Sequence, residues 1–266
     1  MKIQVLLATM FFENEDETYL RDMNIETDLV VGNQCDTTKD ESFTFNGHTV
    51  TVLSRKERGV GKNRNLALFH SDADIVVFAD NDIHYRKGYK ALIEEFYTAH
   101  PEAEMVIFNI REIREDGFLD QNLKDKRAKF KDITKFGTDT ITARRESLLK
   151  HRISFSLLFG GGAKYGCGED SLFLRDCYRK GMKIYLCSKT LADLKSREST
   201  WFHGITSKYV YDKGVLFGAM CPRLYRFAIL YHAFKHRKTY AEFGSMKEVV
   251  RLMRKGADEY RSQKRL

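Results

Sequence analysis

The sequence predicts an α/β fold, with a mostly parallel central sheet flanked by helices and a helical extension at the C-terminal end. Three observations indicate this. Short apolar runs typical of buried strands alternate with helical patterns through roughly the first three quarters of the chain. Acidic residues follow several of these runs directly, at the edge where parallel sheets bind ligands. From about residue 207 onward the pattern is helical only.

Length and composition agree with one large α/β domain and a helical appendage. The chain has 266 residues, 42% hydrophobic and 12% aromatic, so it can bury a large core and is neither disordered nor fibrous. Its five cysteines show no CxxC spacing, which argues against a disulfide framework and a zinc site. No apolar stretch approaches the ~20 residues that span a bilayer, and the N-terminal apolar run lacks a signal-peptide cleavage site. We therefore expect a cytoplasmic protein, soluble or peripheral on the inner face of the cell membrane.

The apolar runs and turn signals give an expected order of elements. Strands are predicted at residues 3–9, 28–32, 49–53, 74–79, 105–110, 138–143 and 183–187, and helices from about 62, over 88–100, from about 169 and from about 207 onward. Residues 111–135 are highly charged and are predicted to form a solvated excursion. We expect an α/β domain over 1–206 and a basic helical extension over 207–266.

Two aspartates, Asp80 and Asp82, follow the most strongly β-branched apolar run. Two carboxylates one residue apart in a turn can converge on one hard cation, and Mg²⁺ or Mn²⁺ bound there keeps open positions for phosphate oxygens. Taken alone, the Asp80-Asn81-Asp82 triplet is more often an ordinary turn, because strand ends commonly use Asn and Asp.

A second acidic pair, Glu169 and Asp170, follows Gly166 and Gly168 at the expected start of a helix. The helix dipole favours acidic residues in a first turn, so the pair also fits a purely structural role. The same dipole stabilises the ionised carboxylate that a proton acceptor needs, which makes the pair a candidate general base.

A glycine turn, residues 59–61, opens the helix that follows the third predicted strand. It is not a P-loop, because Lys56 stands where the first glycine belongs and Asn63 replaces the Ser or Thr. Lys62 and Arg64 at the helix start suit a diphosphate or an oxygen-rich base, although an ordinary capped helix has the same pattern.

Taken in order, these motifs resemble those of the family 2 glycosyltransferases of the GT-A fold. The resemblance runs from residue 3 to about 194. It rests on Arg64-Asn65 after the glycine turn, the DxD triplet, and Gly168-Glu169-Asp170 followed by SLFLRDCYRKGMKIYL. It implies a Rossmann-like sheet, with a nucleotide-binding part over about 1–110 and an acceptor-binding part over about 111–206.

The resemblance also implies the activity. The chain would be an inverting, metal-dependent hexosyltransferase that moves a sugar from a UDP-sugar to a hydroxyl of a carbohydrate or lipid-linked oligosaccharide acceptor. The usual context of the family is the synthesis of capsule, lipopolysaccharide or exopolysaccharide at the cell surface.

Individual roles follow from the same resemblance. The implied metal ligands for Mn²⁺ or Mg²⁺ are Asp82, Asp80 and His203. The implied donor-binding residues are Thr9, Asp36, Lys62, Arg64 and Asp80, and the implied catalytic residues are Asp170 and Glu169. The chain departs from the family where its first strand ends without a proline-containing turn and its second ends in GNQCD rather than in paired aspartates. His203 stands among aromatic residues, where a lone histidine is more often structural than a ligand.

Two other functions remain open from the residues. A nucleotidyltransferase that forms sugar nucleotides has a similar sheet, but it normally has a glycine-rich basic loop after the first strand, where residues 9–20 are acidic here. A nucleic-acid-binding module could use the basic tail, but no aromatic-interleaved basic motif supports it, and we expect no nucleic acid partner.

The tail, residues 221–266, has 12 Lys and Arg against 4 Asp and Glu, which accounts for the whole net charge of +8. It also has the spacing of an apolar helical face, formed by Leu224, Phe227, Ala228, Tyr231 and Phe234. The tail is compatible with attachment to an anionic membrane surface and with packing on the catalytic domain as a structural cap.

Overall fold

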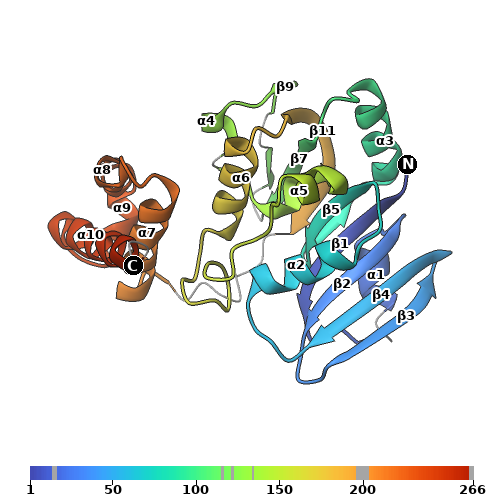
Figure 1. Ribbon diagram of the computed structural model, residues 1–266, viewed down its shortest axis with the longest axis horizontal. Helices are drawn as coiled ribbons and strands as arrows, with labels where there is room; N and C mark the ends of the chain where they lie inside the picture. Colours follow the sequence, from blue (N-terminus) through green and yellow to red (C-terminus); the bar gives the residue numbers. More distant parts are fainter. Residues whose placement is uncertain (14–16, 115–116, 121–122, 134, 196–203, 264–266) are drawn as a thin grey trace.

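The computed structural model describes residues 1–13, 17–114, 117–120, 123–133, 135–195 and 204–263. It has a central mixed sheet with helices on both faces, and the C-terminal helices form a separate group to one side of it (Figure 1). The predicted α/β fold with a helical extension is confirmed.

The elements alternate through the first part of the chain as predicted. The strands are β1 (Ile3–Met10), β2 (Asp28–Gln34), β3 (Lys39–Phe45), β4 (His48–Arg55), β5 (Ile75–Asp80), β6 (Ile83–Tyr85), β7 (Met105–Arg114), β8 (Gly117–Asp120), β9 (Lys126–Arg127), β10 (Ile141–Arg144) and β11 (Ile184–Lys195). The helices are α1 (Glu17–Asp22), α2 (Val60–His70), α3 (Tyr89–Ala99), α4 (Phe130–Ile133), α5 (Arg145–Lys150), α6 (Glu169–Arg179), α7 (Ser207–Met220), α8 (Tyr225–Lys235), α9 (Arg237–Tyr240) and α10 (Met246–Gln263), with a 3₁₀ turn, η1, at Thr138–Thr140.

The order of the strands explains where a site can form. The main path of the sheet runs β3-β4-β2-β1-β5-β10-β7-β11-β6, and β4, β2, β1 and β5 are parallel to one another. Their carboxyl ends therefore lie along one edge, where Ala8 of β1 is in register with Asp80 of β5. Strand β10 is antiparallel to β5, so the residues that precede β10 lie beside the carboxyl end of β5.

Each face of the sheet buries a different set of helices. On one face, Leu20 of α1 and Ile93 of α3 pack into the core. On the other face, Leu68 of α2, Leu148 of α5 and Phe173 of α6 form a second core. The sheet is therefore the middle of three layers, which fixes α2 and α6 on the same face (Figure 1).

The structure differs from the sequence expectation in several segments. The strand predicted over 138–143 begins only at Ile141, after the 3₁₀ turn η1. The prediction of an excursion over 111–135 is wrong at its start, because β7 continues to Arg114 and pairs with β8 in a hairpin. Strand β3 was not expected, since its residues alternate between exposed and half-buried and form no apolar run. It pairs with β4 through the tight turn at Asn46 and Gly47, both with positive φ.

The C-terminal helices have their own core and a close crossing. Helices α7 and α10 approach so closely that a Cβ atom on Gly214 would lie 1.9 Å from the carbonyl oxygen of Met253, and one on Gly256 would lie 2.4 Å from that of Tyr211. Tyr260 of α10 packs edge-on against a ring of the preceding domain, Phe159, with centroids 5.7 Å apart. Within the described residues, no helix is both long and apolar enough to cross a bilayer.

Candidate functional site

Arg64 is the centre of a charged cluster at the carboxyl edge of the sheet. Its side chain is only 4% exposed. Its Nη2 donates to both carboxylate oxygens of Asp80, each at 2.8 Å. Its Nη1 donates to Glu169 Oε1 at 3.1 Å and to Asp170 Oδ1 at 2.9 Å. One guanidinium thus joins the glycine turn, the DxD triplet and the GED motif that stood apart in the sequence.

The first turn of α2 holds Arg64 in this position. Gly59 precedes the helix with φ of 127°, and a Cβ atom on Gly61 would lie 2.2 Å from the carbonyl oxygen of Ser156, so only glycine allows this approach. Asn65 donates to the carbonyl of Phe155 at 2.9 Å and accepts from its N–H at 2.8 Å. The Arg64 guanidinium lies 5.4 Å from the centre of the Phe155 ring.

The first turn of α6 supplies the two acidic partners. Gly168 precedes α6 in the left-handed conformation, with φ of 100°, and a Cβ atom there would clash with Leu216 of α7. Glu169 and Asp170 then open the helix, where its dipole favours negative charge. Thr138 of η1 donates a hydrogen bond to Asp170 Oδ1, the same oxygen that Arg64 contacts.

Asp139 also belongs to the cluster and was not expected from the sequence. Burial, followed by the charges of Asp80, Asp170 and Asp82, raises its pKa from 3.8 to about 7. Asp139 precedes β10, and because β10 is antiparallel to β5, the chain enters the sheet at the edge where β5 ends. No local signal marked Asp139, because the sequence placed it inside a predicted strand over 138–143.

The cluster contains more negative than positive charge. Burial and the neighbouring Asp170 raise the pKa of Glu169 from 4.5 to about 7. Burial opposes the charge of the Arg64 guanidinium, but Asp80, Asp170 and Glu169 together raise its pKa above the ordinary value. Arg64 therefore stays charged, and the carboxylates around it share the single positive charge of its guanidinium.

A divalent cation fits the chemistry of these donors. Carboxylate oxygens are the ligands that Mg²⁺ and Mn²⁺ prefer, and Asp80 and Asp82 supply two such groups at the end of β5. Within the described residues, no three His, Cys, Asp or Glu side chains are arranged so that they could hold a metal. His203, the expected further ligand, lies outside the described residues.

The other expected donor-binding residues lie along the same edge but outside the Arg64 cluster. Thr9 is buried near the end of β1, and its carbonyl accepts from Asn63 at 3.2 Å. Asp36 lies just beyond β2 with an 81% exposed side chain and pairs with Arg58 at 2.9 Å. Lys62 is exposed on the first turn of α2 and pairs with Glu57 at 3.3 Å. The sequence-predicted residues thus fall into a charged group around the buried Arg64 side chain, the buried Thr9, and the exposed Asp36 and Lys62.

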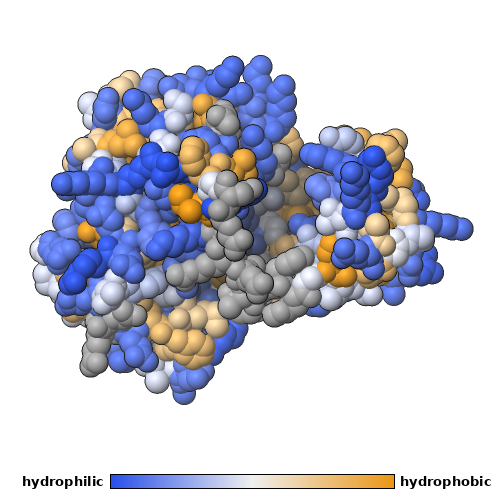
Figure 2. Space-filling view, turned by 180° about the vertical axis from the view of Figure 1, so that it is seen from behind, coloured by the Kyte–Doolittle hydropathy of each residue, from blue (hydrophilic) through white to orange (hydrophobic). Residues whose placement is uncertain are grey.

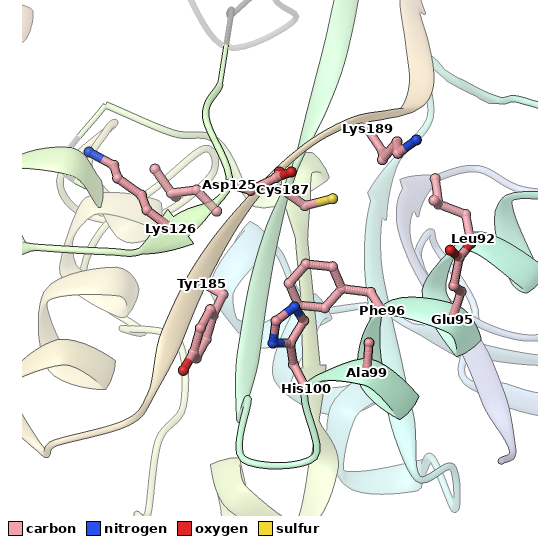
Figure 3. A pocket seen from close by; sticks show the side chains of 11 residues that line it. Leu92, Glu95, Phe96, Ala99, His100, Asp125, Lys126, Tyr185, Cys187 and Lys189 are labelled. Carbon is pink, nitrogen blue, oxygen red and sulfur yellow. The ribbon is translucent and has the colours of Figure 1, made fainter.

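A cavity elsewhere in the domain is not part of this site. It has a volume of about 290 Å³ and lies between α3 and the β9–β11 edge, with Phe96, His100 and Tyr185 among its walls (Figure 3). The stacked His100 and Tyr185 rings have centroids 5.5 Å apart. No residue of the Arg64 cluster lines this cavity.

Solved structures with the same fold include those of TarS from S. aureus. The structure of TarS 1–349 in complex with UDP-GlcNAc has a TM-score of 0.63 and 16% sequence identity, and covers 99% of this chain and 92% of its own. The structure of TarS 1–349 in complex with UDP has a TM-score of 0.62 and 15% identity, and the match covers 98% of this chain and 83% of the TarS chain. A further TarS structure (TM-score 0.57, 18% identity) covers 82% of this chain, which spans only 39% of that longer protein.

Sequence comparison gives the family. No curated protein matches the chain. The model of the family described as "Glycosyl transferase family 2" matches residues 23–159, slightly more than half of the chain. This range contains Arg64, Asp80, Asp82 and Asp139. The chain therefore belongs to glycosyl transferase family 2 and is a glycosyltransferase.

Proposed function

We propose that the chain is an inverting hexosyltransferase that moves a sugar from a UDP-sugar to a hydroxyl of a carbohydrate acceptor. The observation that supports this most is the contact of Arg64 with Asp80, Glu169 and Asp170. One guanidinium thereby joins Asp80, expected near the donor, to Asp170, the expected catalytic base. The complex of TarS with UDP-GlcNAc, a protein with the same fold, supports a UDP-sugar as donor.

Asp170 is the proposed base. Its Oδ1 accepts from Arg64 and Thr138, whereas its Oδ2 accepts no hydrogen bond from any described residue, and the side chain is 29% exposed. Asp170 takes the proton of the acceptor hydroxyl, and the acceptor oxygen forms a bond to the anomeric carbon. The bond from that carbon to the diphosphate breaks, and its electron pair leaves with UDP. One displacement of this kind inverts the configuration.

Glu169 is the weaker candidate for the base. Its side chain is only 12% exposed, and burial together with the neighbouring Asp170 raises its pKa to about 7. Both terminal nitrogens of Arg64 are engaged by carboxylates. We therefore assign Arg64 and Glu169 the role of positioning Asp80 and Asp170. The proposed contacts to uridine are those of Asp36, Lys62 and Thr9.

We assign a Mn²⁺ or Mg²⁺ ion to Asp82, with Asp80 and His203 as further ligands. Bound there, the ion would neutralise the charge that develops on the diphosphate as the nucleotide leaves. The excess of carboxylates supports this assignment, because Asp80, Glu169 and Asp170 all contact the single guanidinium of Arg64.

The acceptor side is proposed to lie in the part of the chain over about 111–206. Leu157 and Leu158 are exposed on the loop that leads to Gly160, where a Cβ atom would lie 2.8 Å from Cδ of Glu169. This apolar surface beside the acid pair suits a lipid-linked oligosaccharide. We accordingly propose a role in surface polysaccharide synthesis. Residues 207–266 form a separate extension in this proposal.

A donor screen tests the proposed function. The purified chain is incubated with Mn²⁺ and each of several UDP-hexoses and UDP-N-acetylhexosamines, and released UDP is measured. We expect release from at least one donor, and none from that donor with the Asp170→Asn variant. Pyrophosphate release from UTP and a sugar phosphate, without UDP release from any donor, would instead identify a nucleotidyltransferase.

A further inference from the structure

Helix α8 has apolar side chains on two opposite faces. One face is buried in the core of the C-terminal helices, through Tyr225, Ile229 and Ala233. The other face is open to solvent. Phe227, Tyr231 and Phe234 are 72%, 69% and 66% exposed, and Leu224 and Leu230 extend the same apolar surface. We call these five residues the outer face of α8. A contiguous apolar surface of this kind commonly marks a site of interaction.

The chain around the outer face contains only positive charge. Residues 213–241 include six Lys and Arg and no Asp or Glu. Lys235 and Lys238 are exposed and form no ion pair with any described residue. The guanidinium of Arg237 lies 4.9 Å from the centre of the Phe234 ring. Orange and blue areas lie next to each other over the C-terminal helices in the space-filling view (Figure 2).

Helix α10 does not have a comparable face. Its apolar residues Val249 and Met253 are buried against the neighbouring helices, and its basic residues Arg251 and Arg254 are exposed without an apolar surface between them. The sequence alone left membrane attachment and packing as a structural cap both open for the whole segment 221–266. The structure separates it into a packed helix, α10, and an unpartnered surface on α8 and α9.

We propose that the outer face of α8 docks on an anionic lipid surface. The aromatic and leucine side chains would enter the interface between headgroups and acyl chains, and the flanking basic residues would contact the anionic headgroups. A second copy of the chain fits less well, because pairing this face with itself would bring like charges together. The attachment does not depend on the proposed transfer reaction, since none of these residues belongs to the Arg64 cluster.

The test is co-sedimentation of the full chain with vesicles. One set contains phosphatidylcholine only, and the other contains phosphatidylcholine and phosphatidylglycerol at 70:30. The apolar variant is Phe227→Ser with Phe234→Ser, and its matched control is Phe69→Ser, at an exposed phenylalanine of α2. The charge variant is Lys235→Glu with Lys238→Glu, and its matched control is Lys131→Glu with Lys150→Glu, at exposed lysines of the α/β domain.

We expect the wild-type chain and both controls to bind the anionic vesicles and not the neutral ones. The apolar variant should bind at least tenfold more weakly, and the charge variant should lose most of its binding as well. Circular dichroism melting curves that match the wild type show that both variants are folded. Equal binding by the apolar variant and the wild type overturns the proposal. Dimerisation of the wild type in solution that the apolar variant loses also overturns it, because the face then covers a second copy.

Discussion

One nitrogen of Arg64, Nη2, donates to both carboxylate oxygens of Asp80 at equal distances of 2.8 Å. The other terminal nitrogen of the same guanidinium holds the acid pair of α6. A buried cation therefore links the end of β5 to the start of α6.

The first prediction concerns the loss of this cation. Arg64→Met should destabilise the fold by up to about 3 kcal/mol, because it leaves carboxylates facing one another without a counter-charge. This decrease in the free energy of unfolding should be larger at pH 8 than at pH 5, since protonation of the carboxylates relieves their mutual repulsion at low pH. Urea unfolding at both pH values measures it. Arg111→Met, which removes a half-exposed partner of Asp193, serves as the control and should cost less than about 1 kcal/mol. An equal cost for the two variants would argue against the central position of Arg64.

The second prediction concerns the metal. Asp82→Ala should lower turnover at least 100-fold and weaken UDP binding in Mn²⁺, because it removes a proposed ligand of the ion. Chelation of divalent ions should have the same effect on the wild type. UDP release and calorimetric titration of UDP measure these effects, with Asp72→Ala as a control at an exposed aspartate. Full activity in excess chelator would rule out the metal role.

The third prediction separates donor binding from chemistry. Asp170→Asn should bind UDP like the wild type but transfer sugar about 10²–10⁴-fold more slowly, because the amide cannot accept a proton. Glu169→Gln should have a smaller effect on the rate of transfer. Single-turnover transfer and UDP affinity are measured in parallel. If Asp170→Asn transfers at the wild-type rate and Glu169→Gln does not, the base is Glu169.

The fourth prediction is a pH dependence of stability. The folded-state pKa of Asp139 is about 7, above its ordinary value of 3.8. Burying the ionised Asp139 carboxylate therefore lowers the free energy of unfolding. This destabilisation is absent below about pH 4, grows as pH rises and is complete above about pH 7. Asp139→Asn removes this cost, so its Tm should exceed that of the wild type by at least about 2–4 °C at pH 8 and equal it at pH 4.

Asp132 provides a control of opposite sign. Its hydrogen bond with Lys126 holds the pKa of the Asp132 carboxyl below its ordinary value, so the contact stabilises the fold above that value and is lost as pH falls. Asp132→Asn should therefore lower the Tm at pH 8. Thermal melts of both variants across this pH range, without divalent ions, provide the comparison. A higher Tm for both variants at pH 8 would contradict the account of Asp139.

The fifth prediction concerns Asn65, which holds the backbone of Phe155 at both its N–H and its carbonyl. Asn65→Ala leaves these two groups without their partner, and a buried group left unpaired costs about 1–3 kcal/mol. The Arg64 guanidinium lies against the Phe155 ring, so turnover should fall together with stability. Urea unfolding and UDP release measure the two effects. Thr98→Ala, whose hydroxyl bonds only within its own helix, should leave both nearly unchanged.

The sequence predicted those parts of the molecule that depend on local patterns. The acidic residues after β5 and at the start of α6 could be located because strand ends and glycine turns leave signals of their own. Asp139 could not be located from the sequence, because its position depends on the antiparallel pairing of β10 with β5, two segments distant in sequence. The apolar spacing on α8 was also visible, but this helix is apolar on two faces, and periodicity alone does not show which face is packed.

The close crossing of α7 and α10 at Gly214 and Gly256 connects the extension to the loop that leads to the Arg64 cluster. Any side chain larger than hydrogen at Gly214 would push the two helices apart. Tyr260, also on α10, packs on Phe159 and Tyr165. These two residues belong to the loop that leads to Glu169. A methyl group added at this crossing would therefore displace α10, and the contacts of Tyr260 with Phe159 and Tyr165 would transmit this displacement to the loop before Glu169 and Asp170. Surveys of natural or laboratory variants should find this pair of glycines as intolerant of substitution as the acids themselves.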